Sequence, residues 1–280
     1  MGSLRFFLLL GLSINFCGCT GLFYHPDQHI YFPPEANGFA AEDITIQTKD
    51  GEKLHGWFFP APAGMKRKGT IVQFHGNAQN ISSHYASLVW ATKAGYDLFI
   101  FDYRGYGKSS GSPSPEGTHI DALSALDWAI ERHQKRKNRH FIVFAQSLGG
   151  VIAARAITDF SQQKLISLLV LDSTFYSYQD LAQEKLAQFW LTWIFSPLGQ
   201  VLVSDSYSAE SSLPKISSRT LVIHDRNDPV VGFRNGEKIY EMIMAPKEFW
   251  ALDQRRHVGV FALDTMDNRS RFLKIAESLP

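Results

Sequence analysis

Short apolar runs alternate with longer amphipathic stretches along most of the chain. Phe141–Phe144 is an uninterrupted apolar run, as a parallel strand covered on both faces requires. Helical periodicity appears in stretches such as Asp121–His133 and Val151–Phe160. The strand-like segments are Ile44–Thr48, Leu54–Phe59, Thr70–His75, Leu98–Asp102, Phe141–Ala145, Ser167–Leu171, Thr220–Ile223 and Glu248–Leu252. Strands that alternate with helices predict an α/β fold, whose mostly parallel, eight-stranded sheet carries helices on both faces.

Two regions depart from this alternation. The turn signal Lys49–Glu52 joins the first two strand-like segments and predicts an antiparallel opening hairpin. Residues 173–213 carry no strand signal, and we expect them to form a helical cap inserted into the domain. Their apolar stripe at helical spacing consists of Leu186, Phe189, Trp190, Trp193 and Ile194. Aromatic side chains in such a stripe either pack in a core or line a pocket, and the sequence leaves both open.

The N-terminus has the pattern of an export signal. Arg5 precedes the apolar run Phe6–Leu12, which is shorter than the roughly 20 residues that span a bilayer but matches a signal-peptide core. Gly18 and Cys19, which follow, resemble the lipobox of bacterial lipoproteins, in which the peptide is cut before an acylated cysteine. An ordinary cleaved signal or a short anchor is the alternative.

This resemblance implies a division of the chain. It predicts a signal peptide over residues 1–18, a tether over residues 19–38 and the α/β domain over residues 39–280. The partner is then a membrane, reached through lipid on Cys19. Thr20 after the cysteine, rather than Asp, favours the outer membrane by resemblance to lipoprotein sorting. A secreted or periplasmic protein is the alternative.

Composition and motifs exclude several classes of function. Lys and Arg number 28 against 27 Asp and Glu, so there is no basic excess to hold nucleic acid. The two cysteines, Cys17 and Cys19, can neither staple the fold nor form a cysteine-based zinc site. The segment Gly105–Ser109 is similar to nucleotide-binding loops. However, Asp102 and Ser110 occupy positions at which those motifs require glycine, so neither motif is present. We therefore expect no metal and no cofactor.

Ser147 is the candidate nucleophile. The segment Ala145–Gly149 joins an apolar strand to a helix and resembles the nucleophile elbow of α/β hydrolases. Small residues two positions before and after the serine leave room for a strained turn, which exposes its hydroxyl at a helix N-terminus. Ala145 stands where that elbow usually has glycine. A buried serine at an ordinary strand-to-helix turn is the alternative.

The order of residues along the chain then suggests the base and the acid. In α/β hydrolases the serine is followed by an acid and then a histidine. Only His224 and His257 follow Ser147, and His257 lies in the loop after the last strand, whereas His224 ends a strand and is expected to be structural. Asp228 matches the family's acid before a short Val-rich turn. Asp172, at the end of the strand before the cap, is the alternative acid.

An oxyanion hole needs two main-chain N–H groups. Leu148, directly after the candidate nucleophile, is expected to supply one. The segment His75–Ala78 resembles the His-Gly-x-x oxyanion loop and is expected to supply the other from Asn77. His75 itself is expected to hydrogen-bond backbone groups.

Taken in order, these motifs resemble those of the Bem46-like and serine-aminopeptidase-like (S33-type) hydrolases. The matching segments are His75–Ala78, Phe101–Gly111, Gln146–Gly150, Asp228 and His257, and the resemblance extends roughly from Asp43 to the C-terminus. It implies an α/β-hydrolase fold and a Ser147-Asp228-His257 triad that works through an acyl-enzyme.

The sequence narrows the substrate only to a class. A serine nucleophile suits esters, thioesters and amides. Phe189, Trp190 and Trp193 of the cap are expected to bind the hydrophobic acyl group of a small-molecule ester or thioester. A peptidase or amidase of the same fold and an inactive, membrane-tethered binding protein are the alternatives. Nothing in the sequence predicts an oligomeric state.

Overall fold

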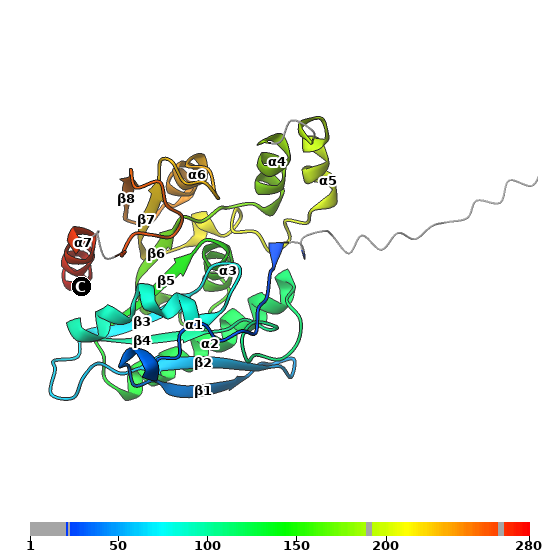
Figure 1. The fold of residues 1–280 in the computed structure, drawn as a ribbon. Coiled ribbons are helices and arrows are strands. Elements are labelled where there is room, and N and C mark those ends of the chain that lie inside the picture. Colours follow the sequence, from blue (N-terminus) through cyan, green and yellow to red (C-terminus); the bar gives the residue numbers. More distant parts are fainter. Residues whose placement is uncertain (1–20, 22, 189–191, 263–265) are drawn as a thin grey trace, which may run out of the picture.

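The computed structural model describes residues 21, 23–188, 192–262 and 266–280 (Figure 1). Eight strands form one sheet in the order β1-β2-β4-β3-β5-β6-β7-β8. Their bounds are β1 Glu42–Gln47, β2 Lys53–Phe59, β3 Gly69–Phe74, β4 Tyr96–Phe101, β5 His140–Gln146, β6 Ile166–Asp172, β7 Arg219–Asp225 and β8 Lys247–Leu252. β2 runs antiparallel to both β1 and β4, and the remaining pairs are parallel. The predicted sheet and its opening hairpin are confirmed.

Helices cover both faces of the sheet. One face carries α2 (Pro115–Lys135), α3 (Leu148–Ile157) and α6 (Arg234–Met242). The other carries α1 (Ile81–His84), the 3₁₀ turns η3 (Tyr85–Ser87) and η4 (Val89–Ala94), and α7 (Met266–Glu277). In β5, Val143 packs in the first layer and its neighbours Ile142 and Phe144 in the second. Because both faces are buried, this strand is apolar at successive positions.

The parallel strands end at one edge of the sheet, and the loops that follow them meet there. Ser147 comes directly after β5, Asp228 lies in the loop after β7, and His257 lies in the loop after β8. Asn77 follows β3, which is the neighbour of β5. In open α/β sheets this edge is where ligands bind.

The cap lies between β6 and β7. It contains α4 (Tyr178–Gln188), the 3₁₀ helix η6 (Trp193–Leu198) and α5 (Gly199–Leu202). α4 and α5 stand side by side outside the body, beyond the carboxyl edge of the sheet (Figure 1). Of the predicted apolar stripe, Leu186 lies in α4 and Trp193 and Ile194 lie in η6, whereas Phe189 and Trp190 lie outside the described residues.

The predicted tether is wrong over residues 23–31, which we call the N-terminal strap. Tyr24 is buried, and its hydroxyl shares hydrogen bonds with the hydroxyls of Tyr178 in α4 (3.0 Å) and Thr118 in α2 (3.2 Å). Phe23 packs edge-on against the ring of Tyr178. Buried aromatic rings hold this segment on the domain, so it is not a free spacer.

Candidate active site

Ser147 occupies a strained turn of the kind that the sequence predicts. Its φ of 51° and ψ of −121° cost a non-glycine residue on the order of 1–3 kcal/mol. The hydroxyl of Thr174 donates to the Ser147 carbonyl over 2.6 Å and holds the turn. Gly149 lets α3 approach β3, because a Cβ there would lie 2.5 Å from the carbonyl oxygens of Phe74 and His75. The turn thus aims the serine at the carboxyl edge of the sheet.

His257 links the serine to Asp228. Its Nδ1 lies 2.8 Å from Asp228 Oδ2, and its Nε2 lies 2.8 Å from Ser147 Oγ. Since a carboxylate only accepts, the proton of the neutral ring belongs on Nδ1, and Nε2 is left to accept from the hydroxyl. The three candidate residues therefore meet in the predicted order.

The carboxylate of Asp228 is buried but fully hydrogen-bonded. Its side chain has no exposed surface, and Oδ1 accepts from the main-chain N–H groups of Val230 (2.7 Å) and Val231 (3.0 Å). Burial alone raises the pKa of Asp228, but the hydrogen bond and charge of His257, together with those N–H groups, bring it below its ordinary value. Asp228 is therefore ionised at neutral pH and can stabilise a positive charge on His257.

Two further side chains fix the loops of the acid and the histidine. His224 is buried, and its Nε2 donates to the carbonyl of Val231 over 2.9 Å, which supports the turn around Asp228. Burial lowers the pKa of His224, so the ring is neutral at neutral pH. Asp225 accepts a hydrogen bond from the main-chain N–H of Gln254. This bond links the end of β7, before the Asp228 loop, to the loop that carries His257. The sequence indicates a structural role for His224, but it contains no signal for the link through Asp225.

Asp172, the alternative acid, is hydrogen-bonded to its neighbours and not to the histidine. Its oxygens accept from the Gln146 side-chain amide and the Ser173 hydroxyl, both at 3.3 Å. In the described part of the chain no hydrogen bond joins it to His257. Burial raises the pKa of Asp172 to about 6. The geometry thus favours Asp228.

The two expected oxyanion donors lie on either side of the serine. Leu148 is the first residue of α3, and within the described residues its N–H and that of Asn77 donate to no protein group. The Asn77 loop passes against the serine, since a Cβ on Gly76 would lie 3.4 Å from Ser147 Cβ. His75 Nδ1 donates to the Gly76 carbonyl over 2.7 Å, a backbone contact of the expected kind. This arrangement leaves two N–H groups for a developing oxyanion.

The N-terminal strap holds the Asn77 side chain, which the sequence does not reveal. Asn77 Oδ1 accepts from the main-chain N–H groups of His25 (2.9 Å) and Ala78 (2.8 Å) and from the Tyr106 hydroxyl (2.9 Å). Gly105, with a φ of +80°, lets the loop after β4 turn tightly enough to present Tyr106. Three donors on one oxygen fix the orientation of Asn77.

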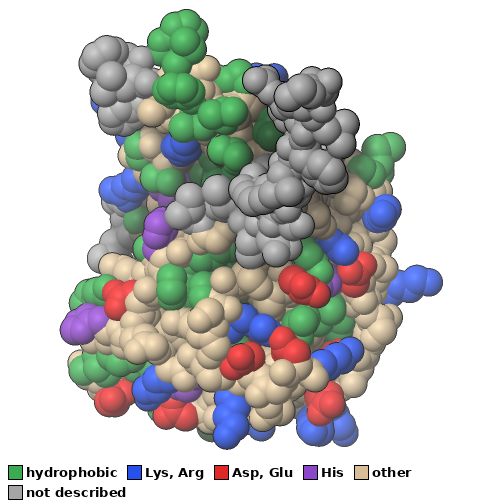
Figure 2. Space-filling model, turned by 90° about the vertical axis from the view of Figure 1, so that its right-hand side faces the viewer, with side chains coloured by type: hydrophobic (Ala, Val, Ile, Leu, Met, Phe, Trp, Pro, Cys, Tyr) green, Lys and Arg blue, Asp and Glu red, His purple; other side chains and the backbone are tan. Residues whose placement is uncertain are grey.

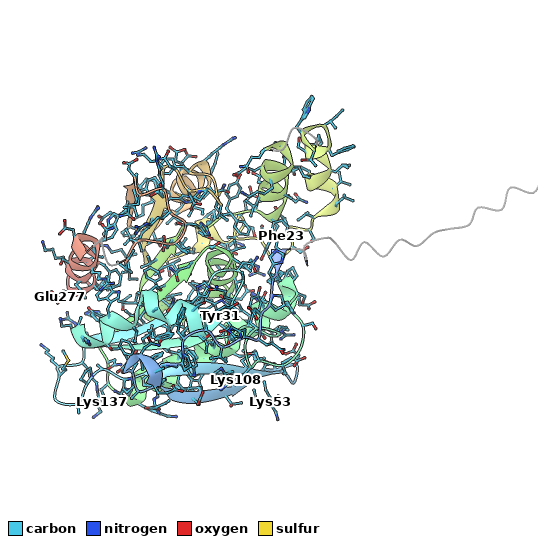
Figure 3. The ribbon with its side chains drawn as sticks, in the orientation of Figure 1. Phe23, Tyr31, Lys53, Lys108, Lys137 and Glu277 are labelled. Carbon is cyan, nitrogen blue, oxygen red and sulfur yellow. The ribbon has the colours of Figure 1, made fainter. Side chains whose placement is uncertain are left out.

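The same strap is fixed at the far end of this loop. Asn80 Nδ2 donates to the carbonyls of Asp27 (3.0 Å) and His29 (2.7 Å). The main-chain N–H of Tyr31 donates to Ser82 Oγ over 2.9 Å (Figure 3 labels Tyr31). The strap therefore contacts the loop after β3 along its length.

The predicted substrate-binding residues are not brought to this site in the described part of the chain. Phe189 and Trp190 lie outside the described residues, as does Cys19. Trp193 is 61% exposed, and its neighbours Ile194 and Phe195 also expose more than half of their surface. These three side chains therefore neither pack in a core nor line a closed pocket.

A pocket of about 570 Å³ separates the cap from the body. It is lined by Tyr176, Asp180, Gln183, Glu184, Ala187 and residues 232–235, at the start of α6. The Glu184 carboxylate accepts from the Gly232 N–H (3.2 Å) and the Asn235 side chain (3.0 Å). The cap is therefore hydrogen-bonded to the segment that follows the Asp228 turn. Among the described residues no group of three His, Cys, Asp or Glu is arranged to hold a metal ion.

Comparison with known proteins gives relatives and a shared fold. A family model described as serine aminopeptidase, S33, matches residues 65–211. YfhR of Salmonella typhi is 35% identical over 267 residues, which cover 91% of this chain and 85% of the relative. Protein bem46 of Schizosaccharomyces pombe is 34% identical over 155 residues, covering 55% of this chain and 50% of that protein. The esterase Pf2001 of Pyrococcus furiosus has the same fold, with a TM-score of 0.73 at 20% identity over 92% of this chain and 98% of that one.

Proposed function

Because the chain belongs to the serine aminopeptidase S33 family of α/β hydrolases, we propose that it is a serine hydrolase that cleaves carboxylic ester or thioester bonds. One observation carries the proposal: two hydrogen bonds of 2.8 Å join Ser147 Oγ through His257 to Asp228 Oδ2. A hydroxyl, a neutral imidazole and an ionised carboxylate in this order form an activated nucleophile.

Each group has a step in the proposed reaction. His257 Nε2 takes the hydroxyl proton as Ser147 Oγ attacks the carbonyl carbon, and Asp228 stabilises the imidazolium. The N–H groups of Leu148 and Asn77 bind the oxyanion. His257 then protonates the leaving alcohol or thiol, and water releases the acyl group from Ser147 by the same steps.

The substrate we propose is a small ester or thioester with a hydrophobic acyl group. The likeness of the fold to an esterase supports this. A peptidase that grips a charged amino terminus would need free carboxylates near the site. Glu184 is bonded to the body, and Asp180 accepts from Gln200 over 3.0 Å, so the acids that line the pocket bind the protein itself. Contact of Phe189, Trp190 and Trp193 with the acyl group stays a prediction.

We also propose that Cys19 is acylated and anchors the protein to a bacterial membrane. The support is the Gly18-Cys19 motif after the apolar run Phe6–Leu12. Mass spectrometry of the mature N-terminus tests it. An unmodified chain that begins elsewhere than at Cys19 would make this an ordinary exported hydrolase.

A fluorophosphonate probe tests the enzymatic proposal directly. We expect the probe to label the purified chain and to leave Ser147→Ala unlabelled, with both proteins showing the same thermal unfolding. A series of p-nitrophenyl esters of rising acyl length then gives the substrate preference. Failure of the wild-type chain to label would favour an inactive binding protein on this fold.

A further inference from the structure

An exposed apolar surface covers the outer end of the cap. Eleven large hydrophobic side chains are exposed among the described residues, and six of them fall within ten positions of the cap. We call this set the apolar tip; its members are Trp193, Ile194, Phe195, Leu198, Val201 and Leu202, which are each 39–67% exposed. The whole stretch from Leu186 to Ser204 contains no Asp, Glu, Lys or Arg. Clusters of this kind mark an interaction surface on a soluble domain.

The apolar tip lies on η6 and α5, two short helices that pack on α4. Figure 2 shows apolar side chains gathered over the cap on this face of the molecule. Among the described helices none is both long and apolar enough to cross a membrane.

The first described residues of the chain meet the cap at its foot. Phe23 lines an apolar pocket of about 300 Å³ between α4 and α5, together with Leu198 and Leu202 of the tip (Figure 3 labels Phe23). Cys19 is four residues earlier, and an extended chain advances at most about 3.6 Å per residue. A lipid on Cys19 would thus lie within about 14 Å of the foot of the cap.

From this placement we infer that the apolar tip is a membrane-docking surface that lies in the interfacial region of a phospholipid bilayer. Trp193 suits the boundary between headgroups and acyl chains, and the aliphatic side chains of Ile194 and Val201 suit the acyl region. The absence of charged residues from Leu186 to Ser204 lowers the cost of leaving water. The anchor and the tip then hold the carboxyl edge of the sheet near the membrane, so that an ester dissolved in lipid has a short path to Ser147.

Site-directed labelling tests this contact without reference to catalysis. The sequence has no cysteine after Cys19, so Ile194→Cys and Leu165→Cys each place one new thiol on the domain. Leu165 is 46% exposed but precedes β6, at the opposite edge of the sheet from the cap, and is the matched control. Each full chain is labelled with an environment-sensitive fluorophore and reconstituted into vesicles of phosphatidylethanolamine and phosphatidylglycerol that carry a nitroxide lipid. Wild type treated in the same way gives the background.

We expect the nitroxide lipid to quench the label at 194 at least threefold more than the label at 165. Equal quenching at the two sites overturns the inference. In that case a blue-shifted emission at 194 that changes on dilution would indicate a second copy of the chain on the tip. A blue-shifted emission that does not change would indicate the chain's own N-terminal apolar run.

A kinetic comparison separates this inference from the proposed function. The double variant Ile194→Gln, Val201→Gln changes two exposed side chains outside the catalytic machinery. We expect it to hydrolyse vesicle-embedded esters about tenfold more slowly, with unchanged rates on soluble short-chain esters and unchanged fluorophosphonate labelling. Loss of rate on both substrates, or on neither, overturns the docking role. Absence of labelling in wild type would count against the hydrolase proposal alone.

Discussion

The main-chain N–H of His25 donates a hydrogen bond of 2.9 Å to Asn77 Oδ1 across 52 positions of sequence. It also lies 3.1 Å from the Tyr106 hydroxyl, which donates to the same oxygen. The segment that follows the proposed anchor thus holds the residue expected to supply an oxyanion donor. The N-terminal strap and the candidate active site are therefore joined in one hydrogen-bond network.

Tyr106→Phe should lower kcat with little change in KM. The variant removes one of the three donors to Asn77 Oδ1 and one acceptor of the His25 N–H. Complete loss of an oxyanion donor costs about 10²–10³ in kcat, so a displaced donor should cost about tenfold. Tyr31→Phe is the control, because Tyr31 bonds Asp27 within the strap and does not contact Asn77. Equal kcat values for the two variants would show that the strap does not position Asn77 for catalysis.

Asp228→Ala should reduce kcat on a soluble ester by about 10⁴, whereas Asp172→Ala should reduce it much less. Among the described residues, Asp228 is the acceptor of His257 Nδ1, at 2.8 Å. Ser147→Ala and His257→Ala should each abolish turnover, and the double variant should lose no more than either alone, because the three groups act together. Circular dichroism checks that each variant is folded. Collapse of activity in Asp172→Ala with turnover kept in Asp228→Ala would reverse the acid assignment.

The sheet and the three candidate residues could be predicted because side-chain patterns in the sequence mark them. A strand apolar at successive positions, such as Phe141–Phe144, has to be buried on both faces. Ser147, Asp228 and His257 could be picked out because chain order limits the choice after the serine turn. Asp172 could not be excluded, because both acids follow a strand and only their hydrogen bonds in the folded chain distinguish them.

Neither the contacts of the strap nor the exposure of the apolar tip could be predicted from the sequence, and each has its own reason. His25, Asp27 and Tyr31 attach through main-chain groups, which every residue possesses, so no side-chain pattern marks them. The stripe around Trp193 has the composition of a buried helix face. Hydrophobic periodicity identifies the apolar side of a helix but does not show whether protein or solvent covers that side.

Gly149→Ala should destabilise the fold by about 1–3 kcal/mol. Helix propensity alone would favour alanine by up to about 1 kcal/mol. However, the new Cβ would lie 2.5 Å from the main-chain oxygens of Phe74 and His75, which belong to the sheet and its oxyanion loop and cannot rotate away. Urea unfolding measures the loss, and Gly21→Ala, where no atom lies within 4 Å of the new Cβ, is the control. A Gly149→Ala protein as stable as wild type would show that α3 shifts freely.

Asp172→Asn should stabilise the protein at pH 8 and leave its stability unchanged below pH 4. Burial raises the pKa of Asp172 to about 6 from the ordinary 3.8, with the nearby charge of Asp228 acting in the same direction and that of His257 against it. The folded state therefore binds the proton more tightly than the unfolded chain does. Stability is highest below the ordinary pKa, falls as the pH rises towards 6, and stays lower above it.

In wild type, the raised pKa of Asp172 corresponds to a loss of about 3 kcal/mol in the free energy of unfolding when the carboxyl is ionised. Because the surroundings of the carboxylate can relax, we expect a measured difference of about 1–3 kcal/mol. Asparagine keeps an acceptor for the Gln146 amide and can donate to the Ser173 hydroxyl, so the two hydrogen bonds survive without the charge. Urea unfolding at pH 4, 6 and 8 gives the difference, with the exposed Asp253→Asn as control. If Asp172→Asn is less stable than wild type at pH 8, the ionised carboxylate contributes to the fold, and the raised pKa is wrong.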